Sequence, residues 1–273
     1  LLLPVFLFSA HAVVFYGSFS IVQVKVNMLD QEGIKNYVTL YGEILNRHQI
    51  TASDEDLNKI YKLILLIFKL DDLYDSANNV PDQVELNEIR KEMIALMPDC
   101  HPIAMNAIQL VFTAMHDEVH SDLSQSLNYY LNICGKSIGA QLIASYLASK
   151  EGIDWKIWFS NLMVEFNNEI NNIIRLANDY LDITVDVKRM SEEVSQIKAT
   201  HFFSSKLEFK NYLCYRYFYH KIRYYLYLAR FKYLNISSQW RDYLVAINCA
   251  ESVLDFAVKA YMTDKKSGRE PEH

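Results

Sequence analysis

The sequence predicts an all-α protein, and three observations support this fold class. Seven glycines and five prolines in 273 residues are too few for the many turns of a β-sandwich or β-barrel. Hydrophobic residues make up 51% of the chain and charged residues 22%, which is the composition of a folded domain and not of a disordered segment. Apolar residues recur every three or four positions along most of the chain, which is the spacing of helices buried on one face.

The first well-marked helix is expected from residue 53 to residue 70. Ser53 and Asp56 have the spacing of an N-terminal capping pair, in which each side chain bonds to the backbone of the other residue. Apolar residues then recur at helical spacing, at Leu57, Ile60, Tyr61, Ile64 and Phe68. We therefore expect one face of this helix to pack in the core.

Six further helices are expected after this one. Pro81 marks the start of the next helix and Pro98 marks its end. The following helices are expected over residues 103–119, 123–148, 155–186, 207–233 and 240–262. Gly135 and Gly139 lie inside the helix that begins at residue 123, and they predict a kink there. Because the chain has no internal repeat and no linker, we expect residues 1–273 to form a single domain.

The two ends of the chain depart from this pattern. Residues 1–27 form an apolar N-terminal segment, and residues 1–23 carry no charge over a length that could span a bilayer. We favour packing of this segment against the helical core over membrane association. Residues 263–273 are rich in charge, and we expect them to form a frayed tail.

Charge and cysteine content narrow the classes of function. The net charge is −6 and no block of like charges is present, so we expect no nucleic-acid partner. The four cysteines are widely separated and form no C-x-x-C pair, which excludes a zinc ribbon and a redox motif of that type. Cysteines of this kind fit a reducing compartment, so we expect a cytoplasmic protein and leave a homodimer open.

An acidic cluster follows the apolar run of the first marked helix. Asp71, Asp72 and Asp75 place three carboxylates together at the negative end of a helix dipole. Asp71 and Asp75 are four residues apart, so both project from one helix face. Mg²⁺ takes one or two carboxylates and completes its coordination shell with water and phosphate oxygens. The cluster is therefore a candidate metal site, and a solvated acidic helix end is the alternative.

A second set of oxygen ligands lies further along the chain. Asn178, Asp182 and Asp186 are spaced at i, i+4 and i+8, so they form a row of roughly 12 Å along one helix face. An amide oxygen and two carboxylates suit a second Mg²⁺ site. Arg175 points the same way and Lys188 follows the row, and cations beside metal-binding acids indicate a bound anion such as a diphosphate. A plain surface helix is the alternative.

Together, the two motifs resemble the signature pair of class I terpene synthases, D-D-x-x-D followed by N-D-x-x-(S/T)-x-x-x-E. The chain is most similar to the short, single-domain bacterial diterpene synthases of the ent-kaurene synthase type. The resemblance extends over residues 61–72, 130–140 and 175–179. It implies an α-helical barrel that uses Mg²⁺ to remove diphosphate from a C20 prenyl or copalyl diphosphate. Cyclisation of the resulting carbocation would then give a diterpene.

The resemblance also implies roles for individual residues. The implied catalytic set consists of the acidic and amide residues of both motifs: Asp71, Asp72, Asp75, Asn178, Asp182 and Asp186. Of three expected Mg²⁺ ions, Asp71 and Asp75 would hold two, and the second motif would hold the third. The candidates for diphosphate binding are Arg175, Lys188 and Tyr261. The candidates for the wall of the substrate pocket are aromatic: Phe68, Tyr146, Trp158 and Phe159.

The sequence departs from the family pattern in several places. Asp182 stands where Ser or Thr is usual, and Asp186 stands where Glu is usual, although both keep an oxygen ligand. Asn132 occupies the position at which many bacterial members have a diphosphate-sensing arginine. The terminal Arg-Tyr pair is missing, and Lys259 and Tyr261 are its nearest substitutes. No D-x-D-D acid motif is present, so ionisation and not protonation would start the reaction.

Two alternative functions stay open. Residues 178–182 also look like the second aspartate motif of chain-elongating isoprenyl diphosphate synthases, and residues 136–139 look like their K-T-G. Against this, no G-x-K-x-x-R precedes the first motif and no Arg-Arg follows Asp75, so the cations for a second diphosphate are missing from the sequence. The other alternative is a non-catalytic helical scaffold with degenerate acidic motifs.

Overall fold

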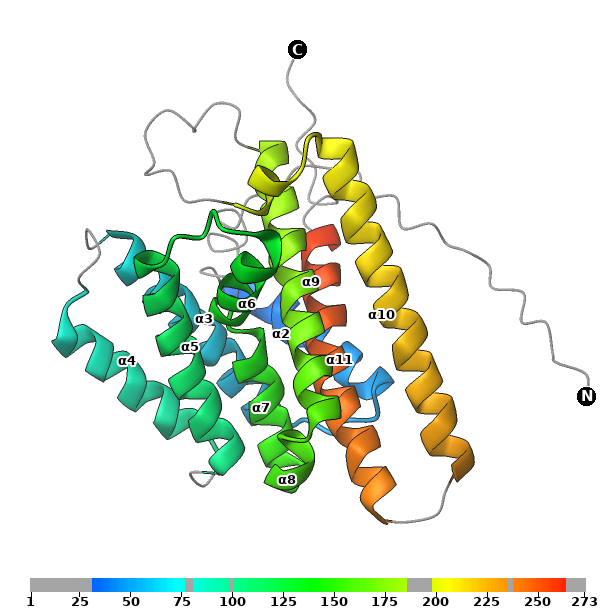
Figure 1. Ribbon diagram of the computed structural model, residues 1–273. Helices are drawn as coiled ribbons and strands as arrows, with labels where there is room; N and C mark the ends of the chain where they lie inside the picture. The colour runs from blue at the N-terminus through cyan, green and yellow to red at the C-terminus, as the bar shows by residue number, and fades with distance from the viewer. Residues whose placement is uncertain (1–30, 77–80, 99–100, 186–197, 235–237, 264–273) are drawn as a thin grey trace, which may run out of the picture.

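The computed structural model describes residues 31–76, 81–98, 101–185, 198–234 and 238–263, and over these it contains α-helices, one 3-10 helix and no strand (Figure 1). The prediction of an all-α protein is confirmed. The helices are α2 (Gln31–Arg47), α3 (Asp54–Ser76), α4 (Gln83–Leu96), α5 (Pro102–His120), α6 (Leu127–Ser137), α7 (Ala140–Lys150), α8 (Trp155–Trp158), α9 (Asn161–Val185), η1 (Ala199–Phe202), α10 (Lys206–Leu234) and α11 (Ser238–Thr263). The expected apolar segment 1–27 and nearly all of the expected tail 263–273 lie outside the described residues.

α3 begins at the capping pair that the sequence predicts. The Ser53 backbone N–H donates to Asp56 Oδ2 at 2.8 Å, and the Asp56 N–H donates back to Ser53 Oγ at 3.2 Å. The helix continues past Leu70, its expected end, and stops at Ser76. The acidic motif at residues 71–75 therefore lies inside the last two turns of α3 and not in the segment that follows it.

The break between α6 and α7 occurs at Gly139. The backbone of this residue has a φ of +74°, a left-handed conformation that residues with a side chain rarely adopt. A Cβ atom added there would also lie 2.8 Å from the side chain of Ile67 on α3, so the chain passes close to α3 at this point. The kink predicted inside the helix 123–148 is thus a complete break between two helices.

The other expected helices need smaller corrections. The helix expected over residues 155–186 is divided, because α8 ends at Trp158 and α9 begins at Asn161. The helices expected over residues 207–233 and 240–262 agree with α10 and α11 to within two residues at each end. Periodicity therefore located the long helices, and the short α8 was merged with its neighbour.

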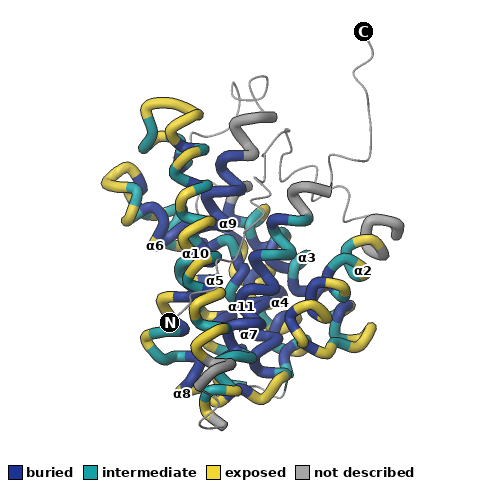
Figure 2. Tube along the Cα trace, turned by 90° about the vertical axis from the view of Figure 1, so that its right-hand side faces the viewer, coloured by how far each residue is buried: buried dark blue, intermediate teal, exposed yellow. Residues whose placement is uncertain are grey.

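α9 is the central helix of the assembly. It packs against α6, α7, α8, α10 and α11, and its apolar side chains, such as Phe166 and Leu176, are almost completely buried. Buried residues gather on the inward sides of the helices, while exposed residues follow their outer sides (Figure 2). None of the helices in the described part of the chain is both long enough and apolar enough to cross a membrane.

α7 runs antiparallel to α3. The hydroxyl of Tyr146, near the end of α7, donates to Asp56 Oδ1 near the start of α3 at 3.0 Å. Gly139, just before α7, lies instead against Ile67, which is eleven residues further along α3 than Asp56. The start of α7 is therefore close to the C-terminal half of α3.

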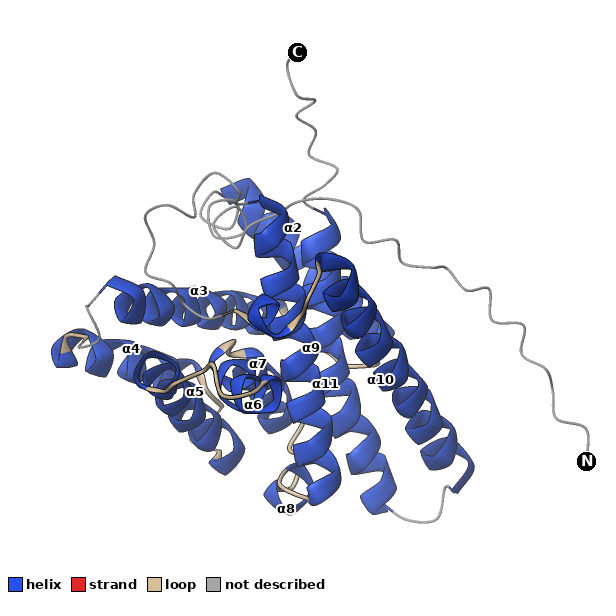
Figure 3. Cartoon of the chain, turned by 45° about the horizontal axis from the view of Figure 1, so that its top comes forward, coloured by secondary structure: helices blue, strands red, loops and turns tan. Residues whose placement is uncertain are grey.

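α7 also runs antiparallel to α9, to which it is joined through α8. Gln141 at the start of α7 accepts a hydrogen bond from Asn171 near the middle of α9, at 3.3 Å. α3 and α9 therefore run in the same direction, and their C-terminal ends lie on the same side of the assembly. Figure 3 shows α6 and α7 beside α9, with α3, α4 and α5 on one side of them and α10 on the other.

A group of charged side chains joins α10 and α11 to the end of α2. We call His48, His220, Lys221, Glu251 and Asp255 the Lys221 network. Lys221 Nζ contacts both carboxylates, Glu251 and Asp255, and its distance to Asp255 Oδ1 is 2.6 Å. His220 Nε2 lies 2.7 Å from Glu251 Oε2, and His48 Nε2 lies 2.9 Å from Asp255 Oδ2. Glu251 is completely buried, so these contacts replace the water that it loses on folding.

Candidate functional site

The acidic motif occupies the C-terminal turns of α3. Leu70 and Tyr74 are buried in the core, whereas Asp71 is half-buried and Asp72 is exposed. The last turn of the helix contains no basic residue, so its negative dipole end is not compensated from within that turn. Asp75 lies in α3, but its side chain falls outside the described set. Of the two described acidic residues, Asp72 is therefore the more exposed to solvent.

Asn178 on α9 presents a buried oxygen with an unused hydrogen-bonding capacity. The residue is 3% exposed, and its Oδ1 has no hydrogen-bond donor within the described structure. A buried polar atom left in this state costs about 1–3 kcal/mol. Six other buried side-chain atoms of the described structure are in the same state, and Asp179 Oδ1 is one of them. An amide oxygen is a ligand that Mg²⁺ accepts, so Asn178 supplies one oxygen of the kind expected from the sequence.

The structure describes only part of the rest of the second motif. Asp182 lies one turn beyond Asn178 in α9, but its side chain is not among those described. Tyr261 lies near the end of α11, and its side chain is also not among those described. The predictions for Asp186 and Lys188 concern residues outside the described part of the chain.

The two motif-bearing helices end on the same side of the assembly. Asp71 is four residues beyond Ile67, the point at which α3 meets Gly139. Asn178 is seven residues beyond Asn171, the point at which α9 meets the start of α7. Because α3 and α9 run in the same direction, both motifs lie beyond α7 at one end of the bundle (Figure 1).

Arg175, a candidate for diphosphate binding, belongs to a buried group that we call the Arg175 network: Glu118, Tyr130, Arg175 and Asp179. Arg175 Nε donates to the Tyr130 hydroxyl at 2.9 Å, and that hydroxyl donates to Asp179 Oδ2 at 2.5 Å. Arg175 also forms ion pairs with Asp179 Oδ1 and Glu118 Oε1, each at 3.1 Å. A phosphate would therefore have to compete with two carboxylates for this guanidinium group.

The Arg175 network joins four parts of the chain. Glu118 comes from α5, Tyr130 from α6, and Arg175 and Asp179 from α9. The Ala199 N–H at the start of η1 completes the group by donating to Asp179 Oδ2 at 2.9 Å. Asp179 is completely buried, so it needs every one of these partners.

Burial and charge act in opposite directions on the pKa values of this network. Burial raises the pKa of Tyr130 well above its usual value, so its hydroxyl keeps the proton that it donates. Burial acts to lower the pKa of Arg175, but the charges of Asp179 and Glu118 outweigh it and raise the pKa. Arg175 is therefore a permanent cation that faces two carboxylates.

The aromatic candidates for a pocket wall do not lie together. Tyr146 is buried at the end of α7, where it bonds Asp56 at the start of α3. Trp158 is buried in α8 and Phe159 follows it, so both precede the start of α9. Those three positions are at the opposite end of the bundle from the two motifs. Phe68 alone, one turn before Asp71 on α3, lies at the motif end.

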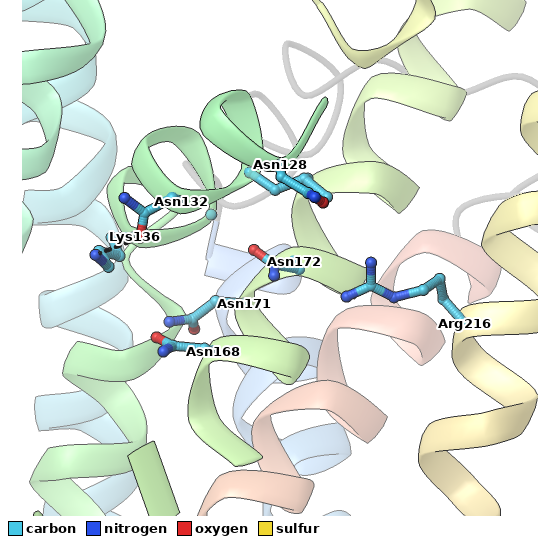
Figure 4. Close-up of a pocket in the computed structure, with 9 residues that line it drawn as sticks. Asn128, Asn132, Lys136, Asn168, Asn171, Asn172 and Arg216 are labelled. Atoms are coloured by element: carbon cyan, nitrogen blue, oxygen red, sulfur yellow. Dashed lines mark hydrogen bonds between the residues drawn. The ribbon is translucent and has the colours of Figure 1, made fainter. Parts of the chain in front are cut away.

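A polar pocket of about 150 Å³ lies between α6, α9 and α10 (Figure 4). Its lining residues are Asn128, Leu131, Asn132, Gly135, Lys136, Asn168, Asn171, Asn172 and Arg216. Within it, Lys136 Nζ donates to Asn132 Oδ1 at 2.9 Å, and Arg216 is held by an ion pair with Glu169 of α9. No pocket is predicted here from the sequence, although Asn132 and residues 136–139 resemble positions of family motifs. The asparagines of α6 and α9 recur three or four residues apart in the sequence.

Comparisons of the chain with protein-family models, with curated proteins and with solved structures each found no match. Among the described side chains, no three His, Cys, Asp or Glu residues come close enough together to hold a metal ion. That set does not include the side chains of Asp75, Asp182 and Asp186.

Proposed function

We propose that the protein is a class I terpene synthase that uses Mg²⁺ to ionise a C20 prenyl or copalyl diphosphate and forms a diterpene. The observation that carries the proposal is the buried, unpaired Oδ1 of Asn178 on a helix that ends on the same side as the acidic motif. This amide is the first member of the oxygen row expected from the sequence. The carboxylates of Asp71 and Asp72 are accessible on α3.

The roles of the chain's own residues follow from charge. When bound, Mg²⁺ would neutralise the charge that develops on the diphosphate as the allylic C–O bond breaks. Asp71 would supply an anionic oxygen for the ion from α3, and Asn178 would supply a neutral oxygen from α9. Because the Asn178 side chain is already buried, it loses little conformational freedom when it binds a cation.

The Arg175 network supports this arrangement by fixing the position of Asn178. Arg175 and Asp179 flank Asn178 on α9, and both are tied to α5 and α6 by buried contacts. A ligand held by its neighbours needs little reorganisation before it binds, which favours affinity. We therefore assign Arg175 a positioning role, with direct binding of the diphosphate as its alternative.

The proposal is tested by turnover of the full chain. Purified protein is incubated with geranylgeranyl diphosphate, with copalyl diphosphate and with farnesyl diphosphate, each with and without Mg²⁺, and products are analysed by mass spectrometry. We expect a cyclic hydrocarbon or alcohol from a C20 substrate only when Mg²⁺ is present. In a parallel reaction, labelled isopentenyl diphosphate with an allylic primer should give no longer prenyl chain.

Variants separate a catalytic from a merely structural role. Asp71→Ala and Asn178→Leu should each abolish turnover while the helical circular dichroism spectrum is retained. The matched control is Asn248→Ala, because Asn248 is also a buried amide but is fully bonded to His48 and Tyr224. This control should lower the melting temperature and keep turnover. Elongated chains, or normal turnover in Asn178→Leu, would contradict the proposal.

A further inference from the structure

α10 exposes a continuous row of large apolar side chains. Its exposed members are Tyr215, Phe218, Tyr219, Ile222, Tyr225 and Leu226, each between 41% and 65% exposed, together with Ala229. We call these seven residues the α10 outer face. Figure 1 shows α10 at the edge of the assembly, and Figure 2 shows exposed residues along its outward side. A surface helix normally presents polar side chains on this side.

The opposite side of α10 is also apolar. Phe209, Leu213 and Tyr224 are buried there against the rest of the bundle. Between Asn211 and Ala229, the exposed positions in the described part of α10 include no charged residue. The exposed side of a surface helix is normally charged or polar. The α10 outer face is instead uncharged, and its only polar side-chain groups are the hydroxyls of its three tyrosines.

The size of the face matches that of a protein interface. With roughly 200 Å² for a large side chain, the exposed fractions correspond to about 700 Å² of apolar surface. The largest apolar patch of a typical monomer is about 300–600 Å², whereas a standard interface buries about 800 Å² on each partner. The area is therefore sufficient for a specific partner.

The order of residues along the face is symmetric about Ile222. Tyr219 and Tyr225 lie three residues to either side, and Phe218 and Leu226 lie four residues to either side. Tyr215 and Ala229 lie seven residues to either side, so a large side chain is matched with a small one. Two antiparallel helices related by a two-fold axis through Ile222 would place each residue against its symmetric counterpart. Such self-complementarity is the requirement of a symmetric dimer.

Three cations beside the centre of the face are paired with carboxylates of the same protomer. Arg216 pairs with Glu169, Lys221 pairs with Glu251 and Asp255, and Arg223 Nη2 lies 3.8 Å from Glu165. These cations do not form the free basic border by which interfacial helices attach to anionic lipid. A neutral apolar face is suited to a second copy of itself.

We propose that the α10 outer face is the interface of a homodimer in which two α10 helices pack antiparallel about Ile222. Ile222 contacts its own copy on the axis, Phe218 contacts the partner's Leu226, and Tyr219 contacts the partner's Tyr225. The proposal does not depend on the terpene synthase function, because neither candidate motif lies on α10.

The first test is the mass of the full chain in solution. Sedimentation equilibrium of the wild-type chain should give the mass of a dimer, and Ile222→Lys should give the mass of a monomer, because it places two like charges together on the axis. The matched control is Val84→Lys on α4, since Val84 is also 64% exposed but lies outside the face. This control should remain a dimer. Circular dichroism should show that both variants keep the helical fold.

The second test concerns the register. Phe218→Glu and Leu226→Lys should each weaken the dimer, and the two substitutions in one chain should restore it, because they form two ion pairs across an antiparallel axis. A parallel arrangement would place Glu against Glu, so the double variant would stay monomeric and would overturn the proposed register.

A monomeric wild-type chain, or a dimer unaffected by Ile222→Lys, would overturn the interface. If the wild-type chain were a monomer that sediments with anionic vesicles, and Ile222→Lys did not sediment with them, the face would be assigned to lipid binding instead.

Discussion

The Arg175 network and the Lys221 network are both buried groups of charge, but they differ in their supply of cations. The Arg175 network pairs two carboxylates, Glu118 and Asp179, with one guanidinium group. The Lys221 network pairs two carboxylates with one lysine and two histidines. In the second network each carboxylate also contacts a histidine, His48 at Asp255 and His220 at Glu251. The first network therefore depends on a single cation, whereas the carboxylates of the second have further partners.

This difference predicts how each network tolerates the loss of its cation. Loss of the only cation leaves a fully buried carboxylate without a countercharge, which is among the most destabilising changes in a protein. Carboxylates that keep other hydrogen-bond partners retain part of their stabilisation when one cation is removed. We therefore expect loss of the cation to cost more in the Arg175 network than in the Lys221 network.

The largest effect is expected from Arg175→Met. The substitution keeps a long side chain but leaves Glu118 and Asp179 unpaired, so we expect a loss of about 3–5 kcal/mol in the free energy of unfolding. Urea titration followed by circular dichroism measures this loss. The control is Lys59→Met, which removes an exposed ion pair with Glu55 on one helix and should leave stability unchanged. An equal effect of both substitutions would refute a structural role of the network.

A smaller effect is expected from Lys221→Met. His48 and His220 remain in contact with Asp255 and Glu251, so we expect a loss of about 2 kcal/mol in the free energy of unfolding. Urea titrations of the variant and the wild type at neutral pH measure this loss. A loss as large as that of Arg175→Met would show that the histidine contacts do not support the two carboxylates.

The third prediction concerns the acid stability of the wild-type chain. Burial acts to raise the pKa of Asp255, but contacts with His48 and Lys221 lower it by more, and the pKa of Glu251 is lowered in the same way. Since these pKa values are lower in the folded state, their stabilisation is complete above the ordinary carboxyl pKa of about 4 and is lost as the pH falls further.

We expect Asp255 to account for about 1–2 kcal/mol of the fall in unfolding free energy between about pH 5 and about pH 3. The free energy of unfolding is measured at both pH values for the wild type and for Asp255→Asn. The contribution of Asp255 is the difference between the two falls in free energy. The variant should show the shallower fall. A steeper fall in the variant would show that the sign is wrong.

The smallest effect on stability is expected from Asn178→Leu, although it neighbours the Arg175 network. Its Oδ1 makes no hydrogen bond within the described structure, so replacement by an apolar group of similar size should change the free energy of unfolding by less than about 1 kcal/mol. Asp179→Leu at the next position removes three contacts and should cost several times as much. Thermal unfolding of both variants compares them directly. A large loss in Asn178→Leu would show that its amide is structural.

The sequence was sufficient to predict most of the long helices, because their signals are local, but it marked no separate helix at α2 and merged α6 with α7. Ser53 and Asp56 mark the start of α3, and apolar spacing marks α10 and α11 to within two residues. Gly139 was recognised as a point of irregularity, but its close contact with Ile67 was not. That contact depends on how two distant helices pack, and no local pattern records it. The sequence therefore predicts only a kink at Gly139, whereas the structure has a complete break between α6 and α7 there.

The candidate site was predictable only in part, and for the same reason. Spacing along α9 identified Asn178 and Arg175 as neighbours on one face, but it could not identify Glu118 on α5 as the partner of Arg175. Tyr146 and Trp158 were chosen for their aromatic character, and only the packing of α7 and α8 reveals that they lie far from Asp71. The partners of a side chain across the bundle depend on tertiary structure.

Gly139 has a consequence for how this sequence can diverge. Two independent constraints apply there, since its φ of +74° disfavours any side chain and Ile67 occupies the space that a Cβ would need. A smaller residue at position 67 would relieve the second constraint but not the first, so no single compensating change opens the position. Gly152 also has a positive φ, but no atom lies within 4 Å of its missing Cβ, so asparagine is an accessible replacement. In descendants of this chain, position 152 can change to asparagine, while position 139 stays glycine.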